Sequence, residues 1–355
     1  MRPQDAESTL FRGSLVFCFA VLSLASALAQ PCMEISAEIE LIGYRGTDSD
    51  GASNARPRTI SVVCLTGTNG WRIEDDWVVG ALTTSFFDGT NVYSTCRVKS
   101  EVPKEQRDLV TRTTGLAQVP FEVARSNLTI NVWPSRDGHP LGMAPANITW
   151  LAFCSGSYLK RQGRLVPLPV DVLHHTRDRF AYTDKTATFD DDLGLPRTVD
   201  LFLSRSLFLN SEADFDKEAA FGDRYAEWTK KTAEKLDEGA HMFHYEVTES
   251  TNFLGSEFPT RFEFFQNSRN FEQNGDWVWR GSGRVKSLRP AAALDGVFDT
   301  RMQQTIVDRR FRDPVSTVDA IVYTSTHAFL APTNDAALQE KFANRIAEIA
   351  RTRNK

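Results

Sequence analysis

The string Cys154-Ser155-Gly156-Ser157 holds the residue types of a nucleophilic enzyme site. A cysteine nucleophile needs a neighbouring base to form its thiolate, and His174 and His175 follow about 20 residues later. Cys154, however, falls on an apolar stripe at helical spacing, and the string is not the Gly-x-Ser-x-Gly elbow of hydrolases. We therefore predict that Cys154 is a core residue or half of a disulfide, and we assign no catalytic residue and no cofactor.

Histidines and carboxylates gather at several places without the spacing of a metal site. His241 and His244 would share one face of a helix, but their segment alternates like a strand, where residues three apart point to opposite faces. The acidic runs Glu74–Asp76 and Asp190–Asp192 do not match a calcium-loop pattern, so we interpret them as solvated turns. No two cysteines have zinc-ligand spacing. The sequence therefore predicts no metal site.

Aromatic residues carry the remaining signal, since the chain has 24 Phe, 7 Trp and 7 Tyr. They crowd two segments, 71–93 and 262–279. Each ring buries about 150–250 Å² when enclosed, so this crowding favours a large core. The alternative is a concavity for a lipid or other hydrophobic ligand, or a face on which sugars stack. The candidate ligand-binding residues are Trp71, Trp77, Phe87, Tyr93, Phe264 and Trp277.

Two aromatic pairs, Phe86-Phe87 and Phe264-Phe265, interrupt the alternation of their segments. Successive residues of a strand point to opposite faces, so one ring of each pair must leave the core side. We therefore expect both faces of these strands to be covered.

The first aromatic segment belongs to a predicted antiparallel meander. Residues 33–41 alternate strictly between apolar and polar side chains, which is typical of a strand with one wet face. Further strands are predicted at 59–65, 71–74, 82–87 and 91–98, and Asp88-Gly89 is the hairpin turn before the last of them.

The rest of the chain mixes strands with three helices. Strands are predicted at 186–189, 199–204, 243–248, 261–266, 277–280, 284–288, 304–312 and 318–324. Helices are predicted at 147–163 with Asn147 as its N-cap, at 211–239, and at about 334–352 near the C-terminus.

Residues 1–29 have the pattern of a secretory signal. Arg2 and Arg12 precede an apolar stretch of about 14 residues, and Ala27-Leu28-Ala29 forms an A-x-A cleavage site. The stretch is shorter than the roughly 20 residues that span a bilayer, and no later segment is long enough. We predict an exported protein, periplasmic or extracellular, with no transmembrane segment in the mature chain.

Cleavage near Ala29 would leave Cys32, Cys64, Cys96 and Cys154. An even number of cysteines in an oxidising compartment permits two disulfides in any of three connectivities. Buried thiols are the alternative, and the sequence leaves the connectivity open. Pro31 before Cys32 argues against a lipoprotein signal, which requires a small residue there.

Composition excludes several classes of protein. The chain has 355 residues, 41% of them hydrophobic, which is too apolar for disorder. Its 41 Lys and Arg against 46 Asp and Glu leave no net basic charge, so we predict no nucleic-acid partner.

Several motifs resemble those of the lipoprotein-localisation (LolA-like) superfamily. Trp71-Arg72-Ile73-Glu74 is followed by Phe87-Asp88-Gly89-Thr90-Asn91-Val92-Tyr93, after a strand that directly follows an export signal. Asp192-Leu193-Gly194-Leu195-Pro196, and Asn252-Phe253-Leu254-Gly255 leading to Phe258-Pro259, look like that family's second half. The resemblance covers about 33–98 and 186–288. It implies an incomplete antiparallel barrel wrapped around helices, with an apolar cavity for acyl chains.

Together these features predict an α+β protein. Residues 1–29 form the signal peptide, 30–330 a single domain that is mainly an antiparallel β-sheet curved into a half-barrel, and 331–355 a C-terminal helix. The leading hypothesis is a non-enzymatic exported protein that binds a lipid or lipidated partner in an aromatic-lined concavity, with peripheral membrane contact. The alternatives are a β-sandwich-like module that binds carbohydrate or protein, and an enzyme whose site is assembled from scattered residues.

Overall fold

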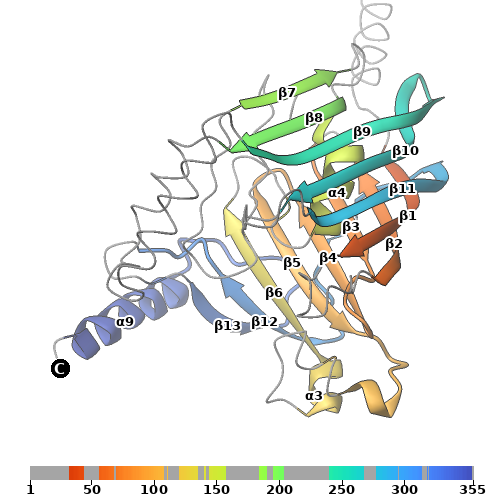
Figure 1. The fold of residues 1–355 in the computed structure, drawn as a ribbon. Coiled ribbons are helices and arrows are strands. Elements are labelled where there is room, and N and C mark those ends of the chain that lie inside the picture. The colour runs from red at the N-terminus through yellow and green to blue at the C-terminus, as the bar shows by residue number, and fades with distance from the viewer. Residues whose placement is uncertain are drawn as a thin grey trace, which may run out of the picture.

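Figure 1 shows the computed structural model of the chain. It describes residues 32–43, 56–67, 69–107, 110, 120–134, 140, 144–156, 184–189, 195–203, 240–267, 277–294, 296–313, 318 and 320–353. The predicted signal peptide at 1–29, the predicted helix at 211–239, His174, His175 and the run Asp190–Asp192 lie outside these residues.

The described strands form one open sheet. They are β1 (Met33–Gly43), β2 (Arg56–Thr66), β3 (Trp71–Asp75), β4 (Ala81–Phe87), β5 (Asn91–Val98), β6 (Asn127–Pro134), β7 (Asp184–Phe189), β8 (Pro196–Leu203), β9 (Ala240–Phe253), β10 (Ser256–Asn267), β11 (Trp277–Pro290), β12 (Gln303–Asp308) and β13 (Ile321–Ser325). Their order in the sheet is β13-β12-β6-β5-β4-β3-β2-β1-β11-β10-β9-β8-β7. Neighbours are antiparallel except β6 and β12, which are parallel. All 13 described strands share one sheet, so this part of the chain is not a two-sheet sandwich.

The sheet is curved and does not close, which confirms the predicted α+β half-barrel. In Figure 1 the strands β7–β11 cross the direction of β4–β6, and β13 and β7 are the end strands of the described sheet. The described helices are α3 (Phe121–Ser126), α4 (Ala144–Phe153) and α9 (Ala336–Arg353), with a 3₁₀ turn at Lys104–Gln106. Buried side chains of β1–β5, β9 and β10 form a single cluster with those of α4. The sheet therefore wraps around α4, and we call the face that touches α4 the interior face.

Helix α4 is apolar on all sides, which is typical of a helix enclosed by a core. Two buried hydroxyls donate to carbonyls of this helix: that of Thr149 on α4 to Pro145 at 2.6 Å, and that of Ser155, just after α4, to Leu151 at 2.9 Å. The helix begins at Ala144, so the prediction of Asn147 as its N-cap is wrong. Pro145 belongs to the first turn, where a missing backbone donor costs nothing.

The five predicted strands of the first meander are confirmed as β1–β5. Strand β6 was not predicted, although Leu128, Ile130 and Val132 alternate with polar residues and are buried. Strand β12 ends at Asp308, earlier than expected, because the chain then turns to build a salt bridge described below. The C-terminal helix is confirmed as α9, and the Asp335 carboxylate accepts a hydrogen bond from the Leu338 backbone amide at 3.0 Å as its N-cap.

The two strands predicted at 277–280 and 284–288 are one continuous strand, β11. Gly281 and Gly283 lie between the two predicted strands. In the sheet these glycines lie opposite Phe264 and Phe262 of β10. The two rings lie over the bare backbone, and a Cβ at Gly283 would collide with the Phe262 ring. The glycines therefore make room for aromatic rings and do not end the strand.

Both faces of β4 and β5 are covered, as the aromatic pairs predict. Phe87 belongs to the interior cluster, whereas Phe86 belongs to a second cluster on the opposite face. There Phe86 packs on Tyr93 with ring centroids 5.5 Å apart, and Tyr93 packs on Phe298 at 5.8 Å. The second pair divides in the same way, because Phe264 is interior and Phe265 stacks on His244 at 5.3 Å.

Helix α9 packs against the edge of the sheet formed by β12 and β13. Its Leu338 and Phe342 join Phe311 and Ile321 in a small cluster, with the rings of Phe311 and Phe342 5.7 Å apart. None of the helices in the described ranges is both long enough and apolar enough to cross a bilayer.

Candidate ligand-binding site

Three of the six candidate residues belong to the buried cluster on the interior face. Trp71 and Phe87 are cross-strand neighbours on β3 and β4 with ring centroids 6.2 Å apart, and Phe264 on β10 belongs to the same buried cluster. Helix α4 lies among them and contributes Trp150 and Phe153. The described rings pack against neighbouring side chains, and whether a ligand also touches them stays a prediction.

The other three candidate residues lie elsewhere. Trp77 follows β3 at the margin of the interior cluster, where the Arg58 guanidinium lies 5.1 Å from its ring centroid. Tyr93 lies on the opposite face and donates a hydrogen bond to Asp88 at 2.6 Å. The backbone of Trp277 begins β11, but its side chain is outside the described part of the structure.

Tyr245 on β9 adds a polar atom to the interior face. Its side chain is fully buried, and its ring packs on Phe262 with centroids 5.6 Å apart. Within the described residues its hydroxyl has no hydrogen-bond partner. Burial raises the pKa of this phenol above its usual range, so it stays a neutral donor. Buried tyrosine hydroxyls usually find a partner, so this one marks a position suited to an acceptor.

Asp75 is a second polar group on this face. It ends β3 in phase with Trp71 and Ile73, and only 3% of it is exposed. Its carboxylate accepts hydrogen bonds from the Thr83 hydroxyl and, at 3.0 Å, from the Trp77 backbone amide. Burial raises its pKa to about 6. The prediction that Glu74–Asp76 is a solvated turn is therefore wrong for Asp75, because strand alternation carries it inward.

The buried carboxyl of Asp75 predicts a pH-dependent stability. Its pKa in the folded chain lies above the ordinary value of 3.8, so its contribution is fully present below about pH 4 and lost as the pH rises through about 6. The shift corresponds to about 2–3 kcal/mol of unfolding free energy. Asp75→Asn removes this titration and is expected to flatten the pH dependence by that amount. Urea unfolding of both proteins at about pH 4 and pH 7 measures it, and identical pH profiles would refute the assignment.

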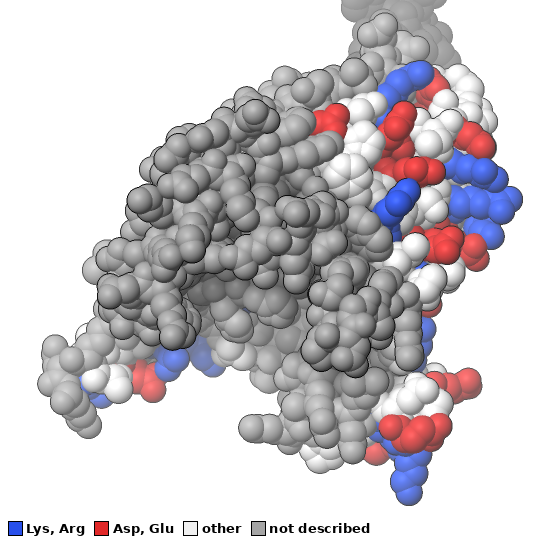
Figure 2. Space-filling model, in the orientation of Figure 1, with Lys and Arg blue, Asp and Glu red and all other residues white. Residues whose placement is uncertain are grey.

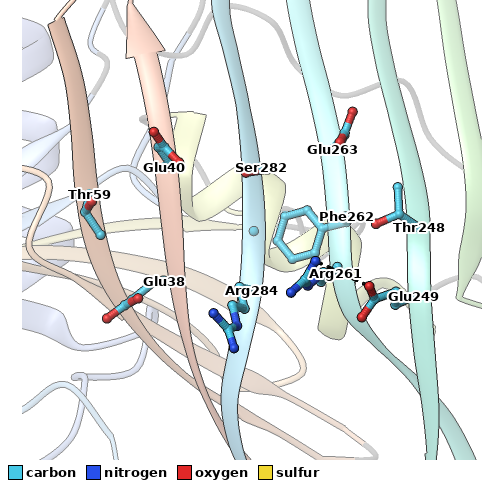
Figure 3. Close-up of a pocket in the computed structure, with 11 residues that line it drawn as sticks. Glu38, Glu40, Thr59, Thr248, Glu249, Arg261, Phe262, Glu263, Ser282 and Arg284 are labelled. Atoms are coloured by element: carbon cyan, nitrogen blue, oxygen red, sulfur yellow. Dashed lines mark ion pairs between the residues drawn. The ribbon is translucent and has the colours of Figure 1, made fainter.

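The outward face of the sheet carries a separate, polar groove with a volume of about 470 Å³ (Figure 3). Thr59, Glu40, Ser282 and Glu263 follow one another across it in the registers of β2, β1, β11 and β10. The remaining residues that line it are Glu38, Thr248, Glu249, Arg261, Phe262, Gly283 and Arg284. This lining suits a polar ligand better than an acyl chain.

Charges of both signs alternate around this groove, and Figure 2 shows them intermixed over β9–β11. Arg261 lies 3.4 Å from Glu249, and Lys286 lies 2.6 Å from Glu38. These four side chains are about half exposed, so each ion pair contributes little to stability.

His244 is held on the outward face by a carboxylate. Its Nδ1 lies 2.8 Å from Asp200 on β8, and its Nε2 lies 3.6 Å from Glu246. The side chain of His241 is outside the described residues, and in the described ranges no three His, Cys, Asp or Glu side chains are placed so that they could hold a metal ion.

A scan of protein-family models and a search of curated proteins found no match to the sequence. Solved structures that are similar to it include the following two. The crystal structure of the LolA superfamily protein NE2245 from Nitrosomonas europaea aligns with 76% of this chain and 90% of that chain, at 10% identity and a TM-score of 0.32. The crystal structure of a DUF1329 family protein from Desulfovibrio piger ATCC 29098 aligns with 77% and 91%, at 7% identity and a TM-score of 0.32. These similarities confirm the weak and partial resemblance that the sequence motifs indicate.

The sequence contained a signal for both polar residues of the interior face. Tyr245 alternates in phase with Phe243 and Val247, and Asp75 alternates with Trp71 and Ile73. The sequence therefore shows that each of these polar groups points inward with its buried neighbours. It does not show which residue, if any, forms a hydrogen bond with that group, because the possible partners lie on other strands.

Proposed function

We propose that the protein binds an amphiphilic ligand with an acyl chain, either a lipid or the lipid of a modified protein, on the interior face beside α4. The proposed activity needs burial and no catalytic residue. The predicted signal peptide at 1–29 supports the further proposal that the protein is exported. The exported protein would contact membranes at their surface.

The fully buried hydroxyl of Tyr245 is the observation that supports this proposal. Ligand sites for amphiphiles are mostly apolar and contain a few placed polar groups. Here the surrounding apolar side chains come from strands on both sides of β1, and Tyr245 supplies one donor that no described residue uses. An ester or carboxyl oxygen of the ligand would satisfy it.

The ligand is tested by native mass spectrometry of the purified full chain, alone and after addition of palmitate or a phosphatidylethanolamine. We expect adducts of acyl-lipid mass. Tyr245→Phe removes the donor, so its ligand affinity is expected to fall about 5- to 10-fold, the worth of one hydrogen bond. Without ligand, the variant should be as stable as the wild type or about 1 kcal/mol more stable, because an unpaired buried hydroxyl is gone.

Arg284→Ala in the outward groove is the matched control, and it should bind both probes as the wild type does. An unchanged mass with both probes would overturn the proposal. Loss of binding in Arg284→Ala with full binding in Tyr245→Phe would overturn the assignment of the site to the interior face and move it to the outward groove.

A further inference from the structure

Cys64 and Cys154 meet in the interior of the protein. Cys64 lies on β2 and Cys154 directly follows α4, and their sulfur atoms are 3.2 Å apart. Both side chains are buried, with 0% and 2% exposed. The Cys154 backbone amide donates to the Trp150 carbonyl at 2.8 Å, so the last helical turn holds this cysteine against the sheet.

The registers of the sheet keep Cys32 and Cys96 away from this pair. The partner of Cys64 on β1 is Ile35, three residues beyond Cys32, a separation of about 10 Å along the strand. Cys96 lies on β5, three strands from β2, which corresponds to about 14 Å. Disulfides need Cα atoms closer than about 7 Å, so neither residue reaches Cys64. Cys32 and Cys96 are four strands apart, about 19 Å, and do not reach each other.

We propose that Cys64 and Cys154 form a disulfide that fastens α4 to β2. Formation consumes one disulfide of an external oxidant, such as an oxidised dithiol protein of the exporting compartment. A sulfur–sulfur bond forms here and one breaks in the oxidant, which receives the two electrons and the two thiol protons as a pair of thiols. The sulfurs must approach by about 1 Å to reach bonding distance, a movement within the range of side-chain rotation.

The burial of the pair determines when the bond can form. Exchange requires a thiolate, and burial together with the neighbouring Cys154 raises the pKa of the Cys64 thiol. We therefore expect oxidation while α4 docks, and slow exchange afterwards. The bond closes a loop with a sequence separation of 90 residues, and loops of this length give large stabilisation.

The bond is tested on the full chain exported to an oxidising compartment, then unfolded in acid and alkylated before and after reduction. We expect Cys96 to be alkylated before reduction, Cys64 and Cys154 only after it, and a peptide pair that joins Cys64 to Cys154. Alkylation of all four residues without reduction would overturn the proposal, as would a linked pair that joins Cys64 or Cys154 to Cys32 or Cys96.

Thermal unfolding of variants gives an independent readout. Cys64→Ala, Cys154→Ala and the double variant should each lower the melting temperature of the oxidised protein by roughly 10 °C, and by the same amount, because each removes the same loop closure. The matched control Cys96→Ala should keep the melting shift that reductant causes in the wild type. If the variants fail to fold, the alkylation pattern of the wild-type chain still tests the Cys64–Cys154 disulfide.

Discussion

Arg310→Met is expected to lower the free energy of unfolding by about 3–5 kcal/mol, since it leaves a buried carboxylate without its counter-charge. Asp308 is fully buried at the end of β12. Arg310 donates to its two oxygens from Nε at 2.9 Å and from a terminal nitrogen at 2.7 Å. The Tyr323 hydroxyl donates to the same carboxylate at 3.1 Å, and Arg310 also donates to the Ala331 carbonyl at 2.7 Å. One network thus ties β12, β13 and the segment before α9 together.

Urea unfolding measures this loss against two further variants. Arg345→Met removes an exposed i,i+3 pair with Glu348 on α9 and should change stability by less than about 0.5 kcal/mol. Asp308→Leu combined with Arg310→Met removes both charges and should recover much of the loss, because apolar groups of similar size replace buried ion pairs well. If the free energy of unfolding of Arg310→Met lay within about 1 kcal/mol of the wild-type value, the proposed stabilising role of this network would be contradicted.

Gly283→Ala is expected to lower the free energy of unfolding by about 2–3 kcal/mol, the upper range for overpacking a filled core. The added Cβ would collide with the Phe262 ring, which is fully buried between Tyr245 and Phe153. Ring centroids lie 5.6 Å and 5.8 Å away on these two sides, so the ring has little space to withdraw.

The matched control is Gly296→Ala, where a Cβ would meet nothing within 4 Å, and its stability should stay equal or rise by a few tenths of a kcal/mol. A double-mutant cycle tests the mechanism: in a Phe262→Leu background the cost of Gly283→Ala should shrink, because the ring it strikes is gone. Equal costs in both backgrounds would show that the strain lies elsewhere.

The alternation of apolar and polar residues predicted the strands well where only one face of the strand is buried. The apolar residues of β1, from Met33 to Leu41, are all buried, as strict alternation requires. Prediction failed at β11, because the sequence alone does not show that phenylalanines of β10 lie over Gly281 and Gly283. It also failed at Asn147, since Pro145 and not a cap residue fits the first turn of α4.

The candidate site was harder to predict because its geometry depends on residues far apart in the chain. The aromatic candidates were chosen by crowding in sequence, which identifies strands that contain rings but cannot assign Tyr93 and Phe87 to opposite faces. The meeting of Cys64 with Cys154 crosses 90 residues, and no spacing rule connects them. Alternation determines which residues point inward, whereas register determines which of them touch.

The central position of β1 has a consequence for how the chain is assembled during synthesis. Strand β1 is the first described strand to leave the ribosome, and its partners are β2 on one side and β11 on the other. Met33 pairs with Thr66 and with Pro290, so one edge of an apolar strand stays unpaired until more than 250 further residues have been made. Strand β6 likewise lacks its parallel partner until β12 has been synthesised. Such long-range pairing is slow. A nascent chain with this topology exposes unpaired strand edges until its last strands have been synthesised, and until then it depends on protection against aggregation.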